Sequence, residues 1–277
     1  MSAMNAATPE LTELEPQRLL WLQERMRLGT DMSLIVEWLR ERGYTDRAIL
    51  AGFEAVRPRG DAVEQGFTKP PLIQRAPPTL TRVDTDKMDL YLLEDFLSAK
   101  ECAKLTGLIA HHLRPSTLAY VIKDEDFRTS TTADLCHLKS PVATSIDQKI
   151  CRTLGIRNDY AEGIQAQRYD VGQQFKAHCD FFPPNTNIFQ KFAGMRGNRT
   201  WTFMVYLNEV EEGGATHFAS INYTVQPKAG RAVLWNNLHP DGTPNEYTRH
   251  AGQPVIKGHK VIITKWFRRY GDGPLFF

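Results

Sequence analysis

The chain has 277 residues, of which 42% are hydrophobic and 24% are charged, a composition typical of a soluble globular protein with one large domain and a smaller module. There are 34 Lys and Arg residues against 32 Asp and Glu residues, so the formal charge of +2 gives no reason to expect nucleic acid or an anionic membrane as partner. No apolar run approaches the roughly 20 residues of a membrane span, and the N-terminus lacks the basic and apolar regions of a secretory signal.

The first 58 residues predict a small helical module after a loose tail at 1–9. Apolar residues at helical spacing predict three helices, over 16–29, over 31–43 with Thr30 or Asp31 as cap, and from a cap at Thr45 onward. The third helix has a single basic residue, Arg47, which disfavours DNA reading. We therefore interpret residues 1–58 as a module that packs on the protein or docks a partner.

Prolines and glycines separate this module from the rest of the chain. Residues 59–87 predict a Pro-rich linker or an extended surface segment. Residues 88–277 then predict a second domain, which opens with a short strand at 88–93. Ser98 and Glu101 have the spacing of a capping box that begins a helix, and Ser140–Pro141 begin another helix that ends at Gly155.

Beyond that second helix the chain is dominated by short strands. We expect them at 161–169, 199–207, 224–226, 230–236, 247–250 and 260–269. Many short strands with Gly and Pro turns are typical of a sandwich or barrel, and helices that precede them indicate an α+β fold with helices on one side.

His178, Asp180 and His250 form the most specific pattern. Side chains at positions i and i+2 of a strand point to the same face, so His178 and Asp180 can face one ligand together. A distant strand can then bring His250 alongside. Two imidazoles and one carboxylate are the facial triad of a non-haem Fe(II) site, which leaves three metal positions open.

Lys260, ten residues after His250, opens the strongly apolar segment KVIITKWF. A buried ammonium is costly without a partner, and the distal carboxylate of a metal-chelating 2-oxo acid would provide one. The hydroxyls of Tyr169 and Thr202 could add hydrogen bonds to that carboxylate. A zinc hydrolase could use the same three ligands but would leave Lys260 unexplained, whereas a halogenase needs the position of Asp180 vacant.

The four cysteines show no C-x-x-C spacing. Without a signal sequence they predict reduced thiols, and we expect a cytoplasmic location, which also suits a ferrous ion.

Four segments together resemble the prolyl 4-hydroxylase group of Fe(II)/2-oxoglutarate dioxygenases: FRTST at 127–131, IQAQRYDVGQQFKAHCD at 164–180, RTWTFMVYLNEVEEGGATHF at 199–218 and HAGQPVIKGHKVIITKW at 250–266. The resemblance covers roughly two thirds of the chain, from about residue 90 to 269. It implies a double-stranded β-helix of the jelly-roll or cupin type, with flanking helices, as the core of the α+β domain.

The resemblance also assigns roles to individual residues. It implies His178, Asp180 and His250 as iron ligands and no catalytic residue beyond the metal site. Lys260 matches the residue that pairs with 2-oxoglutarate. The remaining matches are Tyr169, Thr202 and Trp266 in the co-substrate pocket, and Arg199 and Arg128 near the groove for a peptide substrate.

The implied activity is hydroxylation of prolyl residues in a peptide or protein with Fe(II), 2-oxoglutarate and O2, releasing succinate and CO2, with ascorbate as a candidate reductant. Residues 181–198 depart from the resemblance as a long loop directly after Asp180 that could form a substrate lid. Two alternatives stay open. The same chemistry could act on a free amino acid or small metabolite, or the chain could be a catalytically weak sensor that binds partners through its N-terminal helices.

Overall fold

The computed structural model describes residues 11–27, 32–56, 60–61, 67–117, 124–184, 186–193 and 196–277. The expected tail at 1–9, the helix end at Gly29 and the caps at Thr30 or Asp31 lie outside these ranges. No helix of the described residues is both long and apolar enough to cross a membrane.

Seven α-helices are present in the described residues: α1 Pro16–Arg27, α2 Met32–Arg40, α3 Asp46–Ala55, α4 Pro71–Arg75, α5 Ala99–Ala110, α6 Pro141–Leu154 and α7 Asn187–Phe192. The strands that build the two main sheets are β2 Leu80–Arg82, β3 Leu90–Leu93, β4 Arg114–Pro115, β5 Thr131–Asp134, β6 Gln165–Tyr169, β7 Phe175–His178, β8 Arg199–Tyr206, β10 Thr216–Phe218, β11 Tyr223–Val225, β12 Ala232–Asn236, β13 His250–Gly252 and β15 Lys260–Arg268. Short pairs are formed by β1 Gly60–Asp61 with β16 Tyr270–Gly271, and by β9 Glu212–Gly213 with β14 Val255–Lys257.

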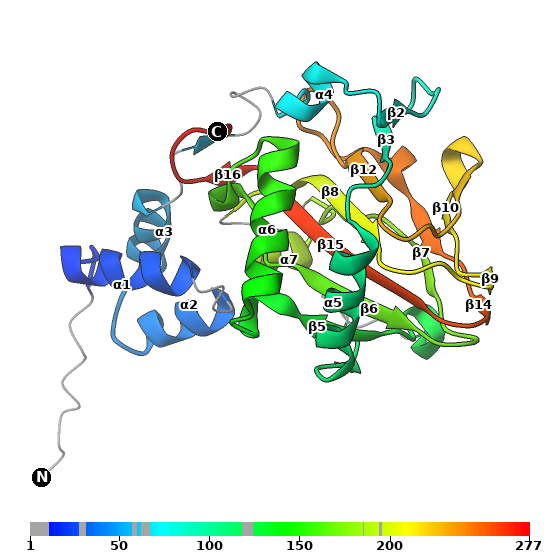
Figure 1. Ribbon diagram of the computed structural model, residues 1–277. Coiled ribbons are helices and arrows are strands. Elements are labelled where there is room, and N and C mark those ends of the chain that lie inside the picture. Colours follow the sequence, from blue (N-terminus) through cyan, green and yellow to red (C-terminus); the bar gives the residue numbers. More distant parts are fainter. Residues whose placement is uncertain are drawn as a thin grey trace, which may run out of the picture.

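The larger sheet has eight antiparallel strands in the order β2-β3-β12-β8-β15-β6-β5-β4. Figure 1 shows α5 and α6 lying across one face of this sheet. Both helices begin where the sequence predicts, and α6 also ends there, at Gly155. Ser98 and Glu101 form the reciprocal capping box of α5, and Gly155 ends α6 in the left-handed conformation with φ of 89°.

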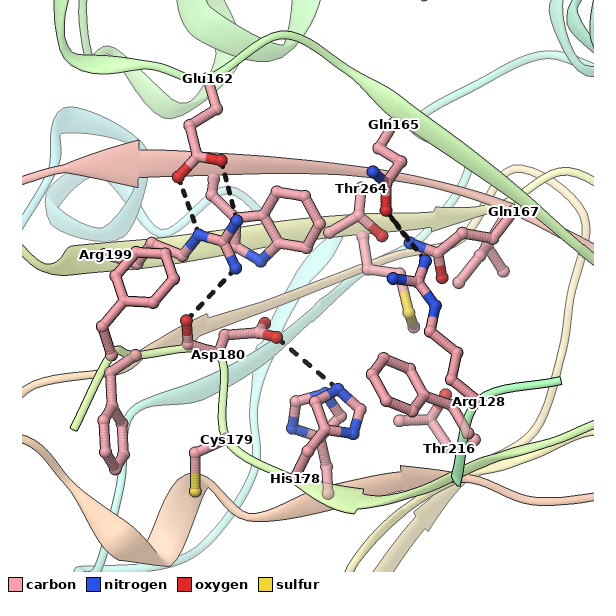
Figure 2. A pocket seen from close by; sticks show the side chains of 18 of the residues that line it. Arg128, Glu162, Gln165, Gln167, His178, Cys179, Asp180, Arg199, Thr216 and Thr264 are labelled. Atoms are coloured by element: carbon pink, nitrogen blue, oxygen red, sulfur yellow. Dashed lines mark hydrogen bonds and ion pairs between the residues drawn. The ribbon is translucent and has the colours of Figure 1, made fainter. Parts of the chain in front are cut away.

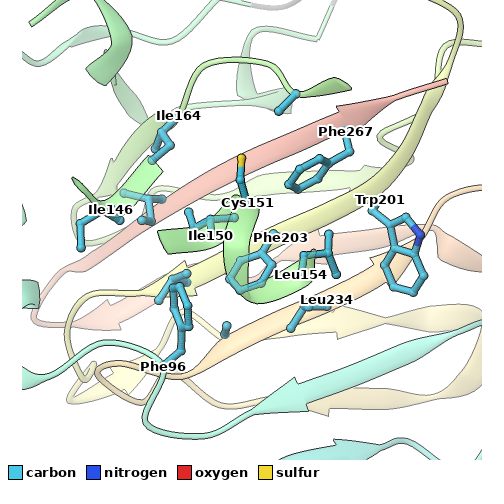
Figure 3. Close-up of a cluster of buried hydrophobic side chains, with 14 of the residues drawn as sticks. Phe96, Ile146, Ile150, Cys151, Leu154, Ile164, Trp201, Phe203, Leu234 and Phe267 are labelled. Atoms are coloured by element: carbon cyan, nitrogen blue, oxygen red, sulfur yellow. The ribbon is translucent and has the colours of Figure 1, made fainter. Parts of the chain in front are cut away.

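Strand periodicity divides the buried residues of this sheet between two cores. Along β8, Phe203 and Val205 face the helices, where they meet Ile150 and Leu154 of α6 (Figure 3). Met204 and Tyr206, on the other side of the same strand, belong to a second core that also contains Trp235 and Phe218. The second core fills the space between the larger sheet and a four-stranded sheet in the order β11-β10-β13-β7.

These two antiparallel sheets confirm the predicted α+β fold with a double-stranded β-helix core and flanking helices. The four-stranded sheet carries the ends of β7 and β13, and its inner face looks toward β6, β8 and β15. The predicted metal ligands therefore lie inside the barrel.

The N-terminal helices α1, α2 and α3 pack on one another around a separate core, which includes Leu22, Leu39 and Phe53. Thr45 caps α3 as predicted, by accepting a hydrogen bond from the backbone N–H of Ala48. Helix α2 contacts α7 of the long loop. A docking role for this bundle stays a prediction.

The described part of the expected linker is packed against the larger domain. Phe67 is fully buried, and its carbonyl accepts a 2.7 Å hydrogen bond from Trp201 Nε1. Helix α4 contacts α6, and β2 extends the edge of the larger sheet by pairing with β3. From Phe67 onward this segment is thus part of the domain's core and edge, because Phe67, Leu72 and Val83 are buried despite the prolines that suggested a linker.

Candidate metal and co-substrate site

His178 and His250 are brought together by strand pairing. Strands β7 and β13 run antiparallel, and these two residues are direct partners in the register. Their ring centroids lie 4.4 Å apart. This strand pairing explains how two residues 72 positions apart in the sequence can face the same point. A distant strand brings His250 alongside His178, as the sequence predicted.

Asp180 follows the end of β7 and points to the same place. Its Oδ1 lies 3.7 Å from His178 Nε2, and the ligand atoms of all three residues lie within 4.8 Å of one another. Its other oxygen, Oδ2, accepts a 2.7 Å hydrogen bond from the Thr202 hydroxyl, which in turn accepts one from Asn237 Nδ2 at 2.9 Å. One carboxylate oxygen is therefore held in place while the other faces the imidazoles.

Both imidazoles are oriented by the backbone. His178 Nδ1 is 2.8 Å from the Lys176 carbonyl and His250 Nδ1 is 2.9 Å from the Thr248 carbonyl, so each Nδ1 carries the proton and donates it. Burial, reinforced by His250, lowers the pKa of His178 to about 3. Burial by itself would raise the pKa of Asp180, but the two imidazoles and the Arg199 guanidinium keep this pKa below its usual value. A neutral His178 imidazole with its Nε2 free and an ionised Asp180 carboxylate are protonation states that suit a divalent metal.

This donor set fits the iron that the sequence suggests. Among the described residues, His178, Asp180 and His250 are the single group of His, Cys, Asp and Glu side chains close enough to share an ion. Aromatic rings surround the group. Phe175 stacks on His178 at 3.6 Å, and Trp235 lies edge-to-face with His250 at 4.8 Å.

Lys260 is buried at the start of β15, with a relative exposure of 1%. Within the described part of the chain its Nζ makes no hydrogen bond or ion pair, and it lies 4.2 Å from the centre of the Tyr169 ring. Desolvation lowers the pKa of Lys260 to about 7. A Cβ at Gly252 would lie 3.2 Å from Nζ, so the glycine leaves the ammonium room beside β13. A buried and unpartnered cation in the cavity is a ready site for an anion.

Three further residues were expected to surround the co-substrate. Tyr169 and Trp266 line the cavity, and the indole Nε1 of Trp266 is buried without a hydrogen-bond partner. The Tyr169 hydroxyl donates to Gln167 Oε1 at 2.9 Å. Thr202 was expected to contact the co-substrate. Its hydroxyl instead donates a hydrogen bond to Asp180, and the residue does not line the cavity. It positions the carboxylate instead.

Arg199 lies beside the metal group in a buried ion-pair cluster (Figure 2). Its Nε and Nη2 donate to the two oxygens of Glu162, each at 2.8 Å, and Arg268 donates to Glu162 as well. Burial by itself would raise the pKa of Glu162, but the guanidinium groups of Arg199 and Arg268 hold this pKa well below its usual range. The Arg199 guanidinium also lies 3.9 Å from the centre of a Trp266 ring. This cluster fixes the orientation of both side chains at the cavity wall.

The cavity itself measures about 740 Å³. The loop at 181–198, for the part that is described, contributes Phe181, Phe182, Pro183 and Phe192 to its wall, and α7 lies within this loop. Sequence reasoning missed Glu162, Phe175, Thr216, Trp235 and Thr264, which also line the cavity. Only Glu162 carried a signal, as an acid near the start of the strand expected at 161–169, and the sequence did not indicate its ion-pair partners Arg199 and Arg268.

Residues 164–268 match the sequence profile of the 2OG-Fe(II) oxygenase superfamily. The chain is 35% identical over 185 residues to prolyl 4-hydroxylase subunit alpha-3 of Rattus norvegicus, covering 65% of this chain and 34% of that protein. It is 33% identical over 191 residues to prolyl 4-hydroxylase subunit alpha-1 of Homo sapiens, covering 68% of this chain and 36% of the relative. The chain thus spans about a third of the length of the curated relatives it matches.

A solved structure agrees with this fold. The viral collagen prolyl hydroxylase from Paramecium Bursaria Chlorella virus-1, in its 2OG complex, superimposes with a TM-score of 0.52 at 26% identity, over 65% of this chain and 95% of that one. The profile match at 164–268 includes all three candidate metal ligands and Lys260, whereas the N-terminal bundle precedes it.

Proposed function

Because residues 164–268 match the profile of the 2OG-Fe(II) oxygenase superfamily, we propose that this chain is a prolyl 4-hydroxylase-like dioxygenase that hydroxylates prolyl residues of a peptide or protein. The observation that carries the proposal is the convergence of His178, Asp180 and His250 beside the unpartnered Lys260. The relatives in the curated set, which are prolyl 4-hydroxylase subunits, support the choice of substrate.

In this proposal the three side chains hold Fe(II) through two Nε2 atoms and one carboxylate oxygen. When bound, iron and 2-oxoglutarate supply the oxidising chemistry, in which O2 and 2-oxoglutarate are consumed, succinate and CO2 are released, and one oxygen atom enters a substrate C–H bond. Lys260 binds the distal carboxylate of 2-oxoglutarate, beside Tyr169. Thr202 keeps Asp180 oriented, and Phe175 and Trp235 keep water from the imidazoles.

The wall of the cavity also supports a prolyl substrate. Phe182 and Trp266 line the cavity, and the central carbon of the Arg199 guanidinium lies 4.8 and 3.9 Å from the centres of their rings. Flat apolar surfaces suit the pyrrolidine ring, and a fixed guanidinium suits the backbone carbonyls of an extended peptide.

A reducing, cytoplasmic location and ascorbate as reductant belong to the same proposal. All four cysteines are free thiols, which supports the reducing compartment.

The decisive experiment is incubation of the full chain with Fe(II), 2-oxoglutarate, O2 and proline-containing peptides. We expect a peptide product heavier by one oxygen atom, found by mass spectrometry, together with an equal amount of succinate. His178→Ala and Asp180→Ala should abolish both products. His217→Ala is the matched control, because His217 bonds to Thr224 on the neighbouring strand β11 and does not line the cavity. Wild-type turnover by either ligand variant would overturn the metal assignment.

A further inference from the structure

Among the arginines that line the cavity, Arg128 differs from Arg199, Arg249 and Arg268 because it has no acidic partner among the described side chains. Its guanidinium donates to four neutral oxygens: Gln165 Oε1 at 2.9 Å, the Thr117 carbonyl at 3.2 Å, Thr132 Oγ1 at 3.3 Å and Ser130 Oγ at 3.4 Å. Asp134 belongs to the same network through Gln165, but its carboxylate is engaged by Arg114. Burial lowers the pKa of Arg128, and the charge of Arg199 adds to this effect.

The neutral partners hold Arg128 close to the metal group. The Arg128 guanidinium lies 4.9 Å from the centre of the Phe175 ring, and the same ring stacks on His178 at 3.6 Å. In Figure 2 the side chains of Arg128 and Arg199 approach His178 and Asp180 from opposite sides. A substrate lying over the metal would therefore pass between two guanidinium groups, of which Arg199 is paired and Arg128 is not.

The charges that line the whole cavity also leave Arg128 without an acidic partner. The lining residues include five cations, Arg128, Arg199, Arg249, Lys260 and Arg268, and four acids, Asp134, Glu162, Asp180 and Glu246. Glu246 lies 3.8 Å from Arg249, Glu162 bonds both Arg199 and Arg268, and Asp134 is taken by Arg114 from outside the lining. The lining therefore carries more cations than acids. The charges of Fe(II) and of the 2-oxoglutarate dianion cancel each other, so their binding leaves this excess of positive charge unchanged.

We propose that this site selects substrates with a carboxylate close to the hydroxylated residue, and that Arg128 binds this carboxylate; the proposal rests on the proposed hydroxylase function. A carboxylate accepts two parallel N–H donors of a guanidinium, so it can replace weaker neutral acceptors such as Ser130 and Thr132, at 3.4 and 3.3 Å. The cavity of about 740 Å³ has room for a peptide segment beside the co-substrate, so an Asp or Glu side chain next to the target proline is the favoured source.

The test uses the full chain and a set of peptides with a single proline. A Glu is placed at each position from three before to three after the proline, and each peptide has a partner with Gln at that position. At one or two positions we expect kcat/KM to be on the order of tenfold to a hundredfold higher for Glu than for Gln, the range for hydrogen bonds to a charged group. This ratio should shrink as ionic strength rises.

Variants connect the ratio to Arg128. In Arg128→Gln the Glu/Gln ratio should fall to about one, and in Arg128→Lys part of it should return, because charge is retained without the planar donor pair. Arg168→Gln is the matched control, because Arg168 is ion-paired with Asp170 outside the cavity lining. A lost fold or a misplaced metal would lower both peptides of a pair together, so the ratio separates recognition from damage.

The outcomes distinguish this proposal from the function on which it rests. Peptide hydroxylation with equal kcat/KM for Glu and Gln, or a Glu preference that survives Arg128→Gln, overturns the carboxylate site and leaves the hydroxylase intact. Free proline and other free amino acids form a second arm. Hydroxylation of these alone, lost in Arg128→Gln, supports the carboxylate site and moves its source to the amino acid itself. Hydroxylation of neither class rejects both proposals.

Discussion

At the scale of single residues, Lys260 shows how a stability cost indicates a function. An ammonium with 1% exposure and no ionic partner in the described ranges is unfavourable in the folded protein, and desolvation accordingly lowers its pKa to about 7. A core built only for stability would carry an apolar residue here, as the adjacent positions Val261 and Ile262 do. A bound anion would offset this cost.

Replacing Lys260 should therefore separate binding from stability. We expect Lys260→Met to raise the Kd for 2-oxoglutarate on the order of 100-fold, the usual consequence of removing one partner of a buried charge pair. The thermal midpoint of the ligand-free protein should not fall, because a desolvated charge has been removed. Calorimetric titration and thermal unfolding measure the two quantities, with Lys257→Met, at an exposed ion pair with Glu211, as control. Unchanged affinity would exclude Lys260 from the co-substrate site.

The same residue should make 2-oxoglutarate binding dependent on pH. The free protein loses the Lys260 proton as pH rises through about 7, whereas a bound carboxylate raises that pKa. Above pH 7 the dianion must then bind together with a proton. We expect Kd to be flat below pH 7 and to rise by about tenfold per pH unit above it. Lys260→Met should lose this slope, and a slope that persisted in the variant would belong to another group.

The sequence predicted the metal group at this scale because each ligand has a chemistry that few other residue types share. It did not predict where the hydroxyl of Thr202 would point, since that depends on Asn237 and Asp180 meeting across three different segments. The isolation of Arg128 could not be predicted either, because a missing acidic neighbour is a property of the folded cavity.

At the scale of elements, the predictable features were those set by local chemistry. The capping box at Ser98, the cap at Thr45 and the left-handed Gly155 each depend on residues within one turn of the helix end. Helix α7 was not expected, and the strand that was expected to hold both His178 and Asp180 is shorter than predicted, because β7 ends at His178 and Asp180 lies beyond it. Strand β7 has only four residues, Phe175–His178, and its pairing with β13 depends on a partner 72 residues away. Local pattern carries no information about such pairing.

Helix α7 offers a test of the long loop as a substrate lid. Phe192 stacks on Phe182 with ring centroids 5.8 Å apart, and its carbonyl accepts a hydrogen bond from Arg268. We expect Phe192→Ala to raise the peptide KM by roughly threefold to tenfold, the value of one aromatic pair, without changing the Kd for 2-oxoglutarate. Phe189→Ala is the control on the same helix, because Phe189 does not line the cavity. Equal effects of both variants would indicate general loosening of α7.

At the scale of the whole molecule, the chain contains cores of very different size. Among the described residues, the core of α1, α2 and α3 is a cluster of eight buried residues, whereas the core between α6 and the larger sheet has thirty-three. Helix α2 nevertheless contacts α7, which follows the cavity wall at Phe182. A bundle of this size has little apolar burial to set against its conformational entropy, so it should be the less stable unit.

Two matched substitutions test whether the cores unfold separately. Leu39 and Leu105 are both fully buried, the first in the bundle and the second in the larger core, and Leu→Ala at such sites costs about 2–5 kcal/mol. We expect Leu39→Ala to lower the midpoint temperature of an early unfolding transition, which is measured by circular dichroism, and to leave succinate formation intact. Leu105→Ala should lower the midpoint temperature of the main unfolding transition, at which activity is lost. If both variants shifted one common transition, the α2–α7 contact would couple the bundle to the catalytic domain, and residues 1–58 could not be treated as an independent module.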